Sequence, residues 1–198
     1  MSDGKPVRGA ADDEAFKDGL VALIPHLRAF ARTLTGDPTA ADDLAQDAMV
    51  KAWDARNSFK LGTNMKAWTF MILRNQFYSD KRRSWRQTQL DQEAAERTLV
   101  AVDDPSAPLA LDELRRALNT LPDEQREALV LVGAGGFAYE EAAAICECAV
   151  GTVKSRVSRA RRALQAALDS GAYSEDGRAA GEAMGAILAE ADRLSGSH

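Results

Sequence analysis

The feature that most constrains this chain is a basic helix with two distinct faces, predicted over residues 150–164. At about 100° per residue, Val157, Ala160 and Leu164 fall within about 40° of Val153 and form one narrow apolar stripe. The segment carries five cations and no acid, although the net charge of the whole chain is −5. Its positive charge is therefore local. The face opposite the stripe is small, polar and cationic, and its members are Gly151, Lys154, Ser155, Ser158, Arg159 and Arg162.

A short Ala-rich helix is predicted just upstream, over residues 139–145, and a brief turn separates it from the basic helix. Its alanines and Ile145 allow close packing, and Glu140 and Glu141 suit the first turn of a helix. The pair is typical of a helix-turn-helix, whose second helix enters the major groove of DNA and meets base edges and phosphates. Taken alone, the segment also fits an ordinary amphipathic helix with a solvated basic face.

Length and composition indicate a soluble protein of one ordinary domain or two small ones. The chain has 198 residues, of which 45% are hydrophobic and 28% are charged, as in folded soluble proteins. No apolar run is long enough to span a bilayer, and the acidic, Gly-bearing N-terminus is unlike a signal peptide. We therefore expect a cytoplasmic protein.

The cysteines and histidines do not predict a metal or cofactor site. Cys146 and Cys148 are the only cysteines and lie two positions apart beside the predicted turn, where the geometry suits a mutual disulfide poorly. A metal would need more ligands, and the only histidines are His26 and His198. We expect no cofactor, and we expect the cysteines to be small buried apolar side chains.

Charge is strongly segregated along the chain. Residues 74–86 hold five cations and one acid, residues 154–162 hold five cations and no acid, and residues 89–113 hold seven acids and one cation. The acidic stretch also contains Pro105 and Pro108, which disfavour helix. The pattern predicts two nucleic-acid-facing modules joined by a flexible acidic linker that phosphate repels. Solubility alone explains the acids equally well.

Helical periodicity without strand alternation predicts an all-α protein. We expect disorder at residues 1–14, and a helical pattern over residues 16–34 that Pro25 kinks or splits. The three glycines between residues 133 and 136 follow no strand and lack a phosphate-binding pattern, so we expect a turn there. Further helices are predicted at residues 40–56, 65–83, 109–121 and 122–132 and, beyond the basic helix, at 180–194.

Aromatic and basic side chains alternate in the helix predicted over residues 65–83. Trp68, Phe70 and Phe77 precede a basic run at residues 81–83. Aromatic rings beside cations suit unpaired bases, which stack on rings and need positive charge along their backbone. Helical spacing alone also explains these rings, and for most of them it favours a place in the core.

Two sets of motifs occur together in the order found in a known family. The run 42–53 (DDLAQDAMVKAW), with the aromatic helix after it, resembles region 2 of bacterial extracytoplasmic-function (ECF) sigma factors. The runs 121–130 (LPDEQREALV) and 151–161 (GTVKSRVSRAR) resemble region 4, and the second of these is the most specific. The runs 130–141 (VLVGAGGFAYEE) and 148–152 (CAVGT) are most similar to the EcfG-type general stress response group of alphaproteobacteria.

The resemblance covers roughly residues 15–170 and implies both a domain organisation and a function. It implies region 2 at residues 15–86, a linker at 87–109, region 4 at 110–170, and a tail at 171–198 with an amphipathic helix. A protein of this family is a sigma factor, which is not an enzyme and directs RNA polymerase to start transcription at chosen promoters.

The resemblance also implies roles for individual residues. An acidic edge with an apolar centre suits docking on a basic helical partner. The residues that would bind the β′ clamp helices of RNA polymerase are Asp43, Gln46, Asp47 and Val50. The loop 59–65 and the helix after it would melt and bind the minus 10 promoter element, with candidate contacts from Asn64, Met65, Lys66, Asn75, Lys81, Arg82 and Arg83. Bases of the minus 35 element would be contacted by Thr152, Lys154, Ser155, Ser158 and Arg159, and its backbone by Arg156, Arg161 and Arg162.

The implied partners are promoter DNA, RNA polymerase core and an anti-sigma protein, with no membrane. For the EcfG-type group, the resemblance implies an anti-sigma protein of NepR type that clasps both modules into a compact form. A PhyR-type response regulator would in turn sequester that inhibitor. The chain departs from the family at Ala138, where a Ser or Thr helix cap is common.

Two other classes of protein remain open. A conventional helix-turn-helix regulator would use residues 139–164 and bind DNA without polymerase, but the acidic helix and aromatic loop would have no role in it. An enzyme such as a recombinase would need a nucleophile or metal constellation before residue 110. His26 stands alone there, and the acids at residues 42–47 lack convergent partners.

Overall fold

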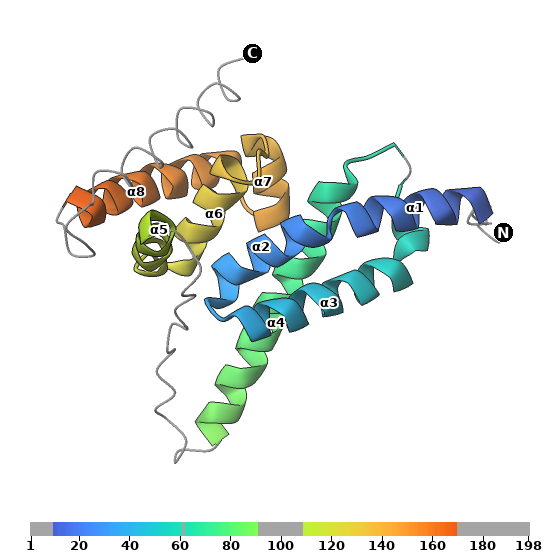
Figure 1. Cartoon of the computed structure of the whole chain (residues 1–198), viewed down its shortest axis with the longest axis horizontal. Coiled ribbons are helices and arrows are strands. Elements are labelled where there is room, and N and C mark those ends of the chain that lie inside the picture. The colour runs from blue at the N-terminus through green and yellow to red at the C-terminus, as the bar shows by residue number, and fades with distance from the viewer. Residues whose placement is uncertain (1–9, 61, 91–108, 170–198) are drawn as a thin grey trace.

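The computed structural model describes residues 10–60, 62–90 and 109–169 (Figure 1). In chain order the elements are α1 (Ala10–Ala22), α2 (Ile24–Thr35), α3 (Pro38–Asp54), the short 3-10 helix η1 (Arg56–Ser58), α4 (Met65–Leu90), α5 (Leu109–Asn119), α6 (Asp123–Gly133), α7 (Tyr139–Cys146) and α8 (Val150–Asp169). Within the described ranges these elements are joined by short turns and no strand occurs. The predicted all-α class is confirmed.

Helices α1 to α4 form a first bundle, which we call the N-module. Apolar residues recur every three or four positions along α2 and α3 and pack against α4. The buried residues of this core are Leu27, Phe30, Ala31, Leu34, Ala41, Leu44, Ala45, Ala48, Phe70 and Leu73. A smaller cluster joins α1 to the end of α3 and to the loop before α4, and its buried members are Phe16, Leu20, Ala52 and Phe59.

Local signals in the sequence set the helix ends of the N-module. Pro25 splits the first helical pattern as predicted, because α1 ends before it and α2 carries it in the first turn, where its missing N–H is no loss. After α2, Gly36 adopts a left-handed φ of 73° that ends the helix. The carboxylate of Asp37 then accepts a hydrogen bond from the Ala40 N–H at 2.7 Å and caps α3.

Helices α5 to α8 form a second bundle, which we call the C-module. The glycine turn predicted before α7 is present, and a Cβ on Gly135 would lie only 2.6 Å from the Leu131 carbonyl oxygen. Glycine is therefore required at that position. Residues from all four helices and from this turn build the buried core: Leu114, Ala117, Leu121, Ala128, Leu129, Leu131, Val132, Phe137, Ala142, Ala143, Ile145, Cys146, Val153, Val157, Ala160 and Leu164.

The two modules pack against each other and share one continuous hydrophobic core. Helix α4 lies against α7, and α2 lies against α5 and α6, while the far end of α4 projects beyond α3 (Figure 1). Phe70 of α4 meets Phe137 edge-on, with 5.0 Å between the ring centroids. The sequence did not predict this contact, which decides the surroundings of the basic residues on α4.

Two predicted boundaries are wrong. Residues 10–14, expected to be disordered, begin α1, because Phe16 enters the aromatic cluster and Asp13 pairs with Arg56 at 3.6 Å. Helix α4 continues to Leu90, beyond the predicted end at residue 83, so its last turn takes up the first residues of the predicted linker. The rest of that linker to residue 108, residues 1–9 and the predicted tail helix at 180–194 lie outside the described residues.

Candidate nucleic-acid interface

Helix α8 buries the apolar stripe that its sequence predicts. Val153, Val157, Ala160 and Leu164 are each at most 1% exposed, and α8 packs against α6 and α7. Because this stripe faces inward, the opposite face of the helix points into solvent. The residues exposed along that face are Gly151, Lys154, Ser158, Arg159 and Arg162, while Thr152 and Ser155 are half-buried at its edge.

Two of the cations predicted to bind the DNA backbone are turned toward the protein. Arg156 is half-buried, pairs with Glu124 of α6 at 2.5 Å, and donates a hydrogen bond to the Cys148 sulfur at 3.7 Å. Arg161 is also half-buried. Arg156 therefore fixes the position of α8 on α6, and the exposed cations of the face are Lys154, Arg159 and Arg162.

The start of α4 holds two of the minus 10 candidates against the C-module. Asn64 caps α4 by accepting a hydrogen bond from the Ala67 N–H at 3.0 Å, and its amide donates to Glu141 of α7 at 2.6 Å. Lys66 donates to the Gly135 carbonyl oxygen at 2.7 Å and lies 4.9 Å from the centre of the Phe137 ring. Both side chains are thus engaged with groups of the other module.

Further along α4 the same pattern continues. Asn75 donates to the Glu147 carboxylate at 3.2 Å, and Lys81 pairs with Asp123 at the start of α6. Beyond Lys81, Arg82 and Arg83 are exposed. Met65 is half-buried and packs on the small aromatic cluster. The seven candidates therefore fall into four that contact the C-module, two that face solvent and one that packs inside the N-module.

A buried polar cluster of Arg74, Tyr78 and Glu127 lies beneath these contacts. Glu127 of α6 is 0% exposed, accepts hydrogen bonds from Arg74 at 2.6 Å and from Tyr78 at 3.2 Å, and both donors belong to α4. The Arg74 guanidinium also lies 4.7 Å from the centre of the Tyr78 ring. A carboxylate fully removed from water needs such partners, and here all of the donors come from the opposite module.

Electrostatics couples the members of this cluster. Burial raises the pKa of the Glu127 carboxyl, and the charge of Arg74 opposes that rise. Burial works against the charged form of Arg74, but the Glu127 carboxylate outweighs it and raises the pKa of the guanidinium. Burial and then the Glu127 charge raise the pKa of the Tyr78 hydroxyl. Arg74 therefore stays charged and Tyr78 stays protonated at neutral pH.

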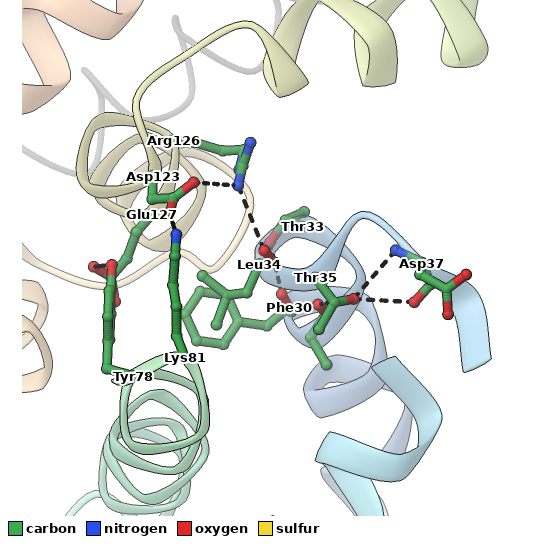
Figure 2. A network of polar contacts seen from close by, with 11 residues as sticks. Phe30, Thr33, Leu34, Thr35, Asp37, Tyr78, Lys81, Asp123, Arg126 and Glu127 are labelled. Atoms are coloured by element: carbon green, nitrogen blue, oxygen red, sulfur yellow. Dashed lines mark hydrogen bonds and ion pairs between the residues drawn. The ribbon is translucent and has the colours of Figure 1, made fainter. Parts of the chain in front are cut away.

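A second set of contacts joins α6 to α2 and α4. Figure 2 shows Asp123 lying between Lys81 of α4 and Arg126 of its own helix. The Asp123 carboxylate accepts a hydrogen bond from the Arg126 guanidinium at 2.9 Å. Arg126 is only 7% exposed. Its guanidinium donates a hydrogen bond to the Leu34 carbonyl oxygen at the end of α2, at 3.4 Å. This carbonyl is one of those a helix leaves without an internal partner. The end of α2 is thus capped from the other module.

The aromatic residues are mainly core residues. Phe70 is buried and stacks on Phe30 with 4.9 Å between the ring centroids. Trp68 is half-buried and lies 5.2 Å from Phe59 and 6.1 Å from Phe16. The interpretation of these rings as core is confirmed.

The acidic edge of α3 is exposed along one side. Asp43, Gln46, Asp47 and Val50 recur at helical spacing on the face opposite the core, and Val50 is 59% exposed. An exposed valine between carboxylates offers a partner both apolar area and negative charge. These four side chains are therefore accessible to a partner, and their role in docking stays a prediction.

Sequence reasoning missed the residues that join the modules. Glu127 lies on the buried side of α6, between apolar positions such as Leu131, and an acid in such a position requires a cationic partner. That requirement is the one signal in the sequence, but it does not identify Arg74. Trp85, 64% exposed, was also missed. It lines a groove of about 550 Å³ between α4, α6 and α8, together with Arg82 and Arg159.

Other kinds of site are not indicated by the described residues. Within residues 10–60, 62–90 and 109–169, no group of three or more His, Cys, Asp or Glu residues is arranged to hold a metal. None of the helices in the same ranges has the length and apolar character needed to cross a membrane. Cys146 is buried and Cys148 is half-buried, so the expected burial holds fully only for the first cysteine.

Known proteins share both the domains and their arrangement. Sigma-70 region 2 matches residues 20–87, and Sigma-70, region 4 matches residues 111–164. The ECF RNA polymerase sigma factor EcfG of Rhodopseudomonas palustris is 48% identical over 155 residues, covering 78% of this chain and 86% of that protein. The ECF RNA polymerase sigma-E factor of Escherichia coli is 33% identical over 135 residues, covering 62% of this chain and 70% of that protein.

Two solved structures are similar in fold. The sigma factor RpoE of Bartonella quintana, solved in complex with the anti-sigma factor NepR, has a TM-score of 0.72 and 47% identity and covers 79% of this chain and 98% of that one. CnrH, solved with the cytosolic domain of CnrY, has a TM-score of 0.60 and 28% identity and covers 81% of this chain and 92% of that one. A helical region 2 and a region 4 helix-turn-helix in one chain define the sigma-70 class. Within that class, the chain belongs to the ECF RNA polymerase sigma factors, of the EcfG type.

Proposed function

We propose that this sigma factor recognises the minus 35 element through the exposed face of α8. The observation that carries the proposal is the contrast between the fully buried stripe of α8 and its exposed Lys154, Ser158, Arg159 and Arg162. Arg and Lys reach guanine acceptors and phosphates in the major groove, and Ser bonds to either kind of base edge. The ion pair between Arg156 and Glu124 supports this role, because it fixes the helix that carries the face.

We propose that the loop before α4 and the adjoining face of α4 bind the minus 10 element. Opened bases would be contacted by Asn64, Met65, Lys66 and Asn75, and phosphates by Lys81, Arg82 and Arg83, as expected from the sequence. Amide and ammonium groups bind the acceptors of unstacked bases and of the strand backbone. Unstacking a base costs a few kcal/mol, which a fitted pocket must offset.

We propose that α3 docks on RNA polymerase through Asp43, Gln46, Asp47 and Val50. Charge reversal at Asp43 and Asp47 should abolish initiation while leaving binding to a minus 35 duplex unchanged. The matched control combines Glu14→Arg with Asp18→Arg, which reverses two exposed acids on α1, outside this face. Loss of initiation in the control as well would refute a specific role for α3.

We propose that the chain responds to general stress and is held inactive by an anti-sigma protein of NepR type. The similarity to a sigma factor solved with NepR supports this partner, because it extends over most of both chains. The protein would act in the cytoplasm with polymerase and would carry out no catalysis of its own.

Run-off transcription tests the proposal directly. The wild-type chain is mixed with core RNA polymerase of Rhodopseudomonas palustris and a promoter library, and initiation from a defined subset of promoters is expected. A gel shift with and without core polymerase separates this from a conventional regulator. Tight, specific duplex binding without polymerase, together with no initiation on any template, would refute the proposed function.

A further inference from the structure

A groove lies where α4, α6 and α8 meet, and Trp85 of α4 forms part of its wall. Its volume of about 550 Å³ is within the range of about 300–1,000 Å³ that is usual for sites of small organic ligands. Trp85 is 64% exposed, whereas most tryptophan rings in folded proteins are largely buried. The flat face of its indole is therefore available to a ligand in the groove.

The acids that line this groove are already paired. The Asp123 carboxylate pairs with Lys81, and the Glu124 carboxylate pairs with Arg156 at 2.5 Å. Each of these ion pairs joins two residues of the groove wall, so the charges within each pair cancel. The two acids therefore leave no negative charge for the other cations of the groove.

Two further cations, Arg82 of α4 and Arg159 of α8, line the same groove. Both side chains are exposed, and neither forms an ion pair or a hydrogen bond with any residue that the structure describes. The wall thus carries two excess positive charges beside one accessible ring. A guanidinium group binds a phosphate through two parallel hydrogen bonds. These features favour a ligand that has an aromatic ring and at least two negative charges.

We propose that this groove is a binding site for a purine nucleoside di- or triphosphate. The base stacks on the indole of Trp85, and the phosphates bind the guanidinium groups of Arg82 and Arg159. Stacking on an aromatic side chain tolerates any base, so adenine and guanine nucleotides should both bind. A purine is preferred to a pyrimidine because its larger ring system covers more of the indole.

The groove fits a single nucleotide better than a nucleic-acid strand. Surfaces that bind single strands carry several rings for successive bases, along a track of positive charge. The other aromatic residue of the groove is Tyr78, which is half-buried and donates to Glu127. The Arg74 guanidinium already lies 4.7 Å from the centre of the Tyr78 ring. Trp85 is therefore the ring that remains for a base.

Nucleotide binding to the full chain, without DNA or polymerase, tests the site. The probe is ATP labelled on the ribose with a methylanthraniloyl fluorophore, and its anisotropy is measured as the protein is added. Unlabelled ATP and GTP should displace the probe. Pyrophosphate, which has the charge without the ring, and adenosine, which has the ring without the charge, should each displace it at least about tenfold less well.

Substitutions in the groove locate the bound nucleotide. Trp85→Ala should weaken probe binding at least about fivefold, because it removes the stacking surface, and Trp85→Phe should restore most of the affinity. Arg82→Ala and Arg159→Ala should each weaken binding about tenfold. The matched controls Arg83→Ala and Arg162→Ala remove the same charge at exposed positions that do not line the groove, and they should stay within about twofold of the wild type.

Several outcomes would overturn the proposal. One is the absence of saturable binding below about 1 mM. Equal displacement by pyrophosphate would exclude stacking, and equal losses in the control variants would reduce binding to general attraction by a basic surface. Displacement by a ten-nucleotide deoxyadenosine strand at a lower nucleotide concentration than ATP would make the groove a strand site instead. Because no promoter is present, these results are independent of the proposed function.

Discussion

The outer face of α8 and the basic edge of α4 carry similar side chains, yet their surroundings differ. Lys154 and Arg159 on α8 face solvent, whereas Lys66 and Lys81 on α4 contact oxygen atoms of the C-module. The difference arises because the acids that meet α4 come from α6, α7 and the turn after α7, far away in the sequence. A basic segment therefore does not by itself indicate an accessible surface, since distant acids decide which cations are available.

The largest effect on the contact between α4 and the C-module should come from removing Arg74. This change leaves Glu127 as a buried carboxylate without its cation. The Arg74→Ala variant should lose about 3 kcal/mol of the free energy of unfolding measured in urea, a factor of roughly 150. Arg28→Ala is the control, since its pair with Asp42 at 3.3 Å is solvent-exposed and should contribute below about 1 kcal/mol. Equal losses in the two variants would contradict the special role of the buried pair.

The reactivity of the two cysteines should differ because one lies beside the contact of α4 with the C-module and the other beside α8. Burial raises the pKa of Cys146 to about 12, and Arg74 and Glu127 lie close enough to affect it. Cys148 is half-buried and touches Arg156 of α8. Since the thiolate is the reactive form, iodoacetamide at pH 8 should modify Cys148 on the order of a hundredfold faster than Cys146. Mass spectrometry of the labelled peptides measures both rates, and in urea the rates should converge. Similar rates in the folded protein would be inconsistent with the burial of Cys146.

Two substitutions on α8 should sharpen the distinction between reading bases and holding phosphates. Arg159→Ala should relax the choice of minus 35 sequence by about 1–3 kcal/mol, measured by competition between promoter variants. Arg162→Ala should weaken all sequences similarly and lower the slope of log affinity against log salt by about one. Each variant serves as the control for the other, and identical salt slopes and specificities would remove the distinction.

The smallest effect is expected at Ala138, the N-cap residue just before α7, whose side chain makes no capping hydrogen bond. The Glu141 carboxylate accepts from the Ala138 N–H at 3.0 Å, so half of a capping box is already present. Ala138→Ser should supply the other half and stabilise the protein by about 1 kcal/mol, raising Tm by roughly 2–4 °C. The control Ala144→Ser, within α7, should give no increase, and a gain there equal to that at Ala138 would exclude capping as the cause.

Features that depend on near neighbours could be predicted from the sequence. The α8 stripe follows from helical periodicity, and every member of it is buried. The split at Pro25 and the turn at Gly135 follow from backbone chemistry that a single residue determines. The exposure of Asp43 and Asp47 follows in the same way, because the apolar residues of α3 already define its inner face.

Features that depend on distant parts of the chain could not be predicted. The start of α1 at Ala10 depends on Phe16 reaching Phe59, more than forty residues away. The state of Lys66 and Asn75 depends on how the modules pack, which no local pattern encodes. Glu127 lies between these two groups of features. Its place among apolar residues predicts a cationic partner, but the sequence does not identify Arg74 as that partner.

The contact of Phe16 with the loop before α4 has a practical consequence for work on this protein. Phe16 lies before residue 20, where the match to region 2 begins, yet its ring is 5.7 Å from that of Phe59. A chain that begins at residue 20 would keep every residue proposed to touch promoter DNA. It would lose Phe16, which forms one side of the aromatic cluster beside those residues. If that shorter chain opened promoter DNA less well, the cause would be the lost packing behind the loop, not a lost contact with DNA.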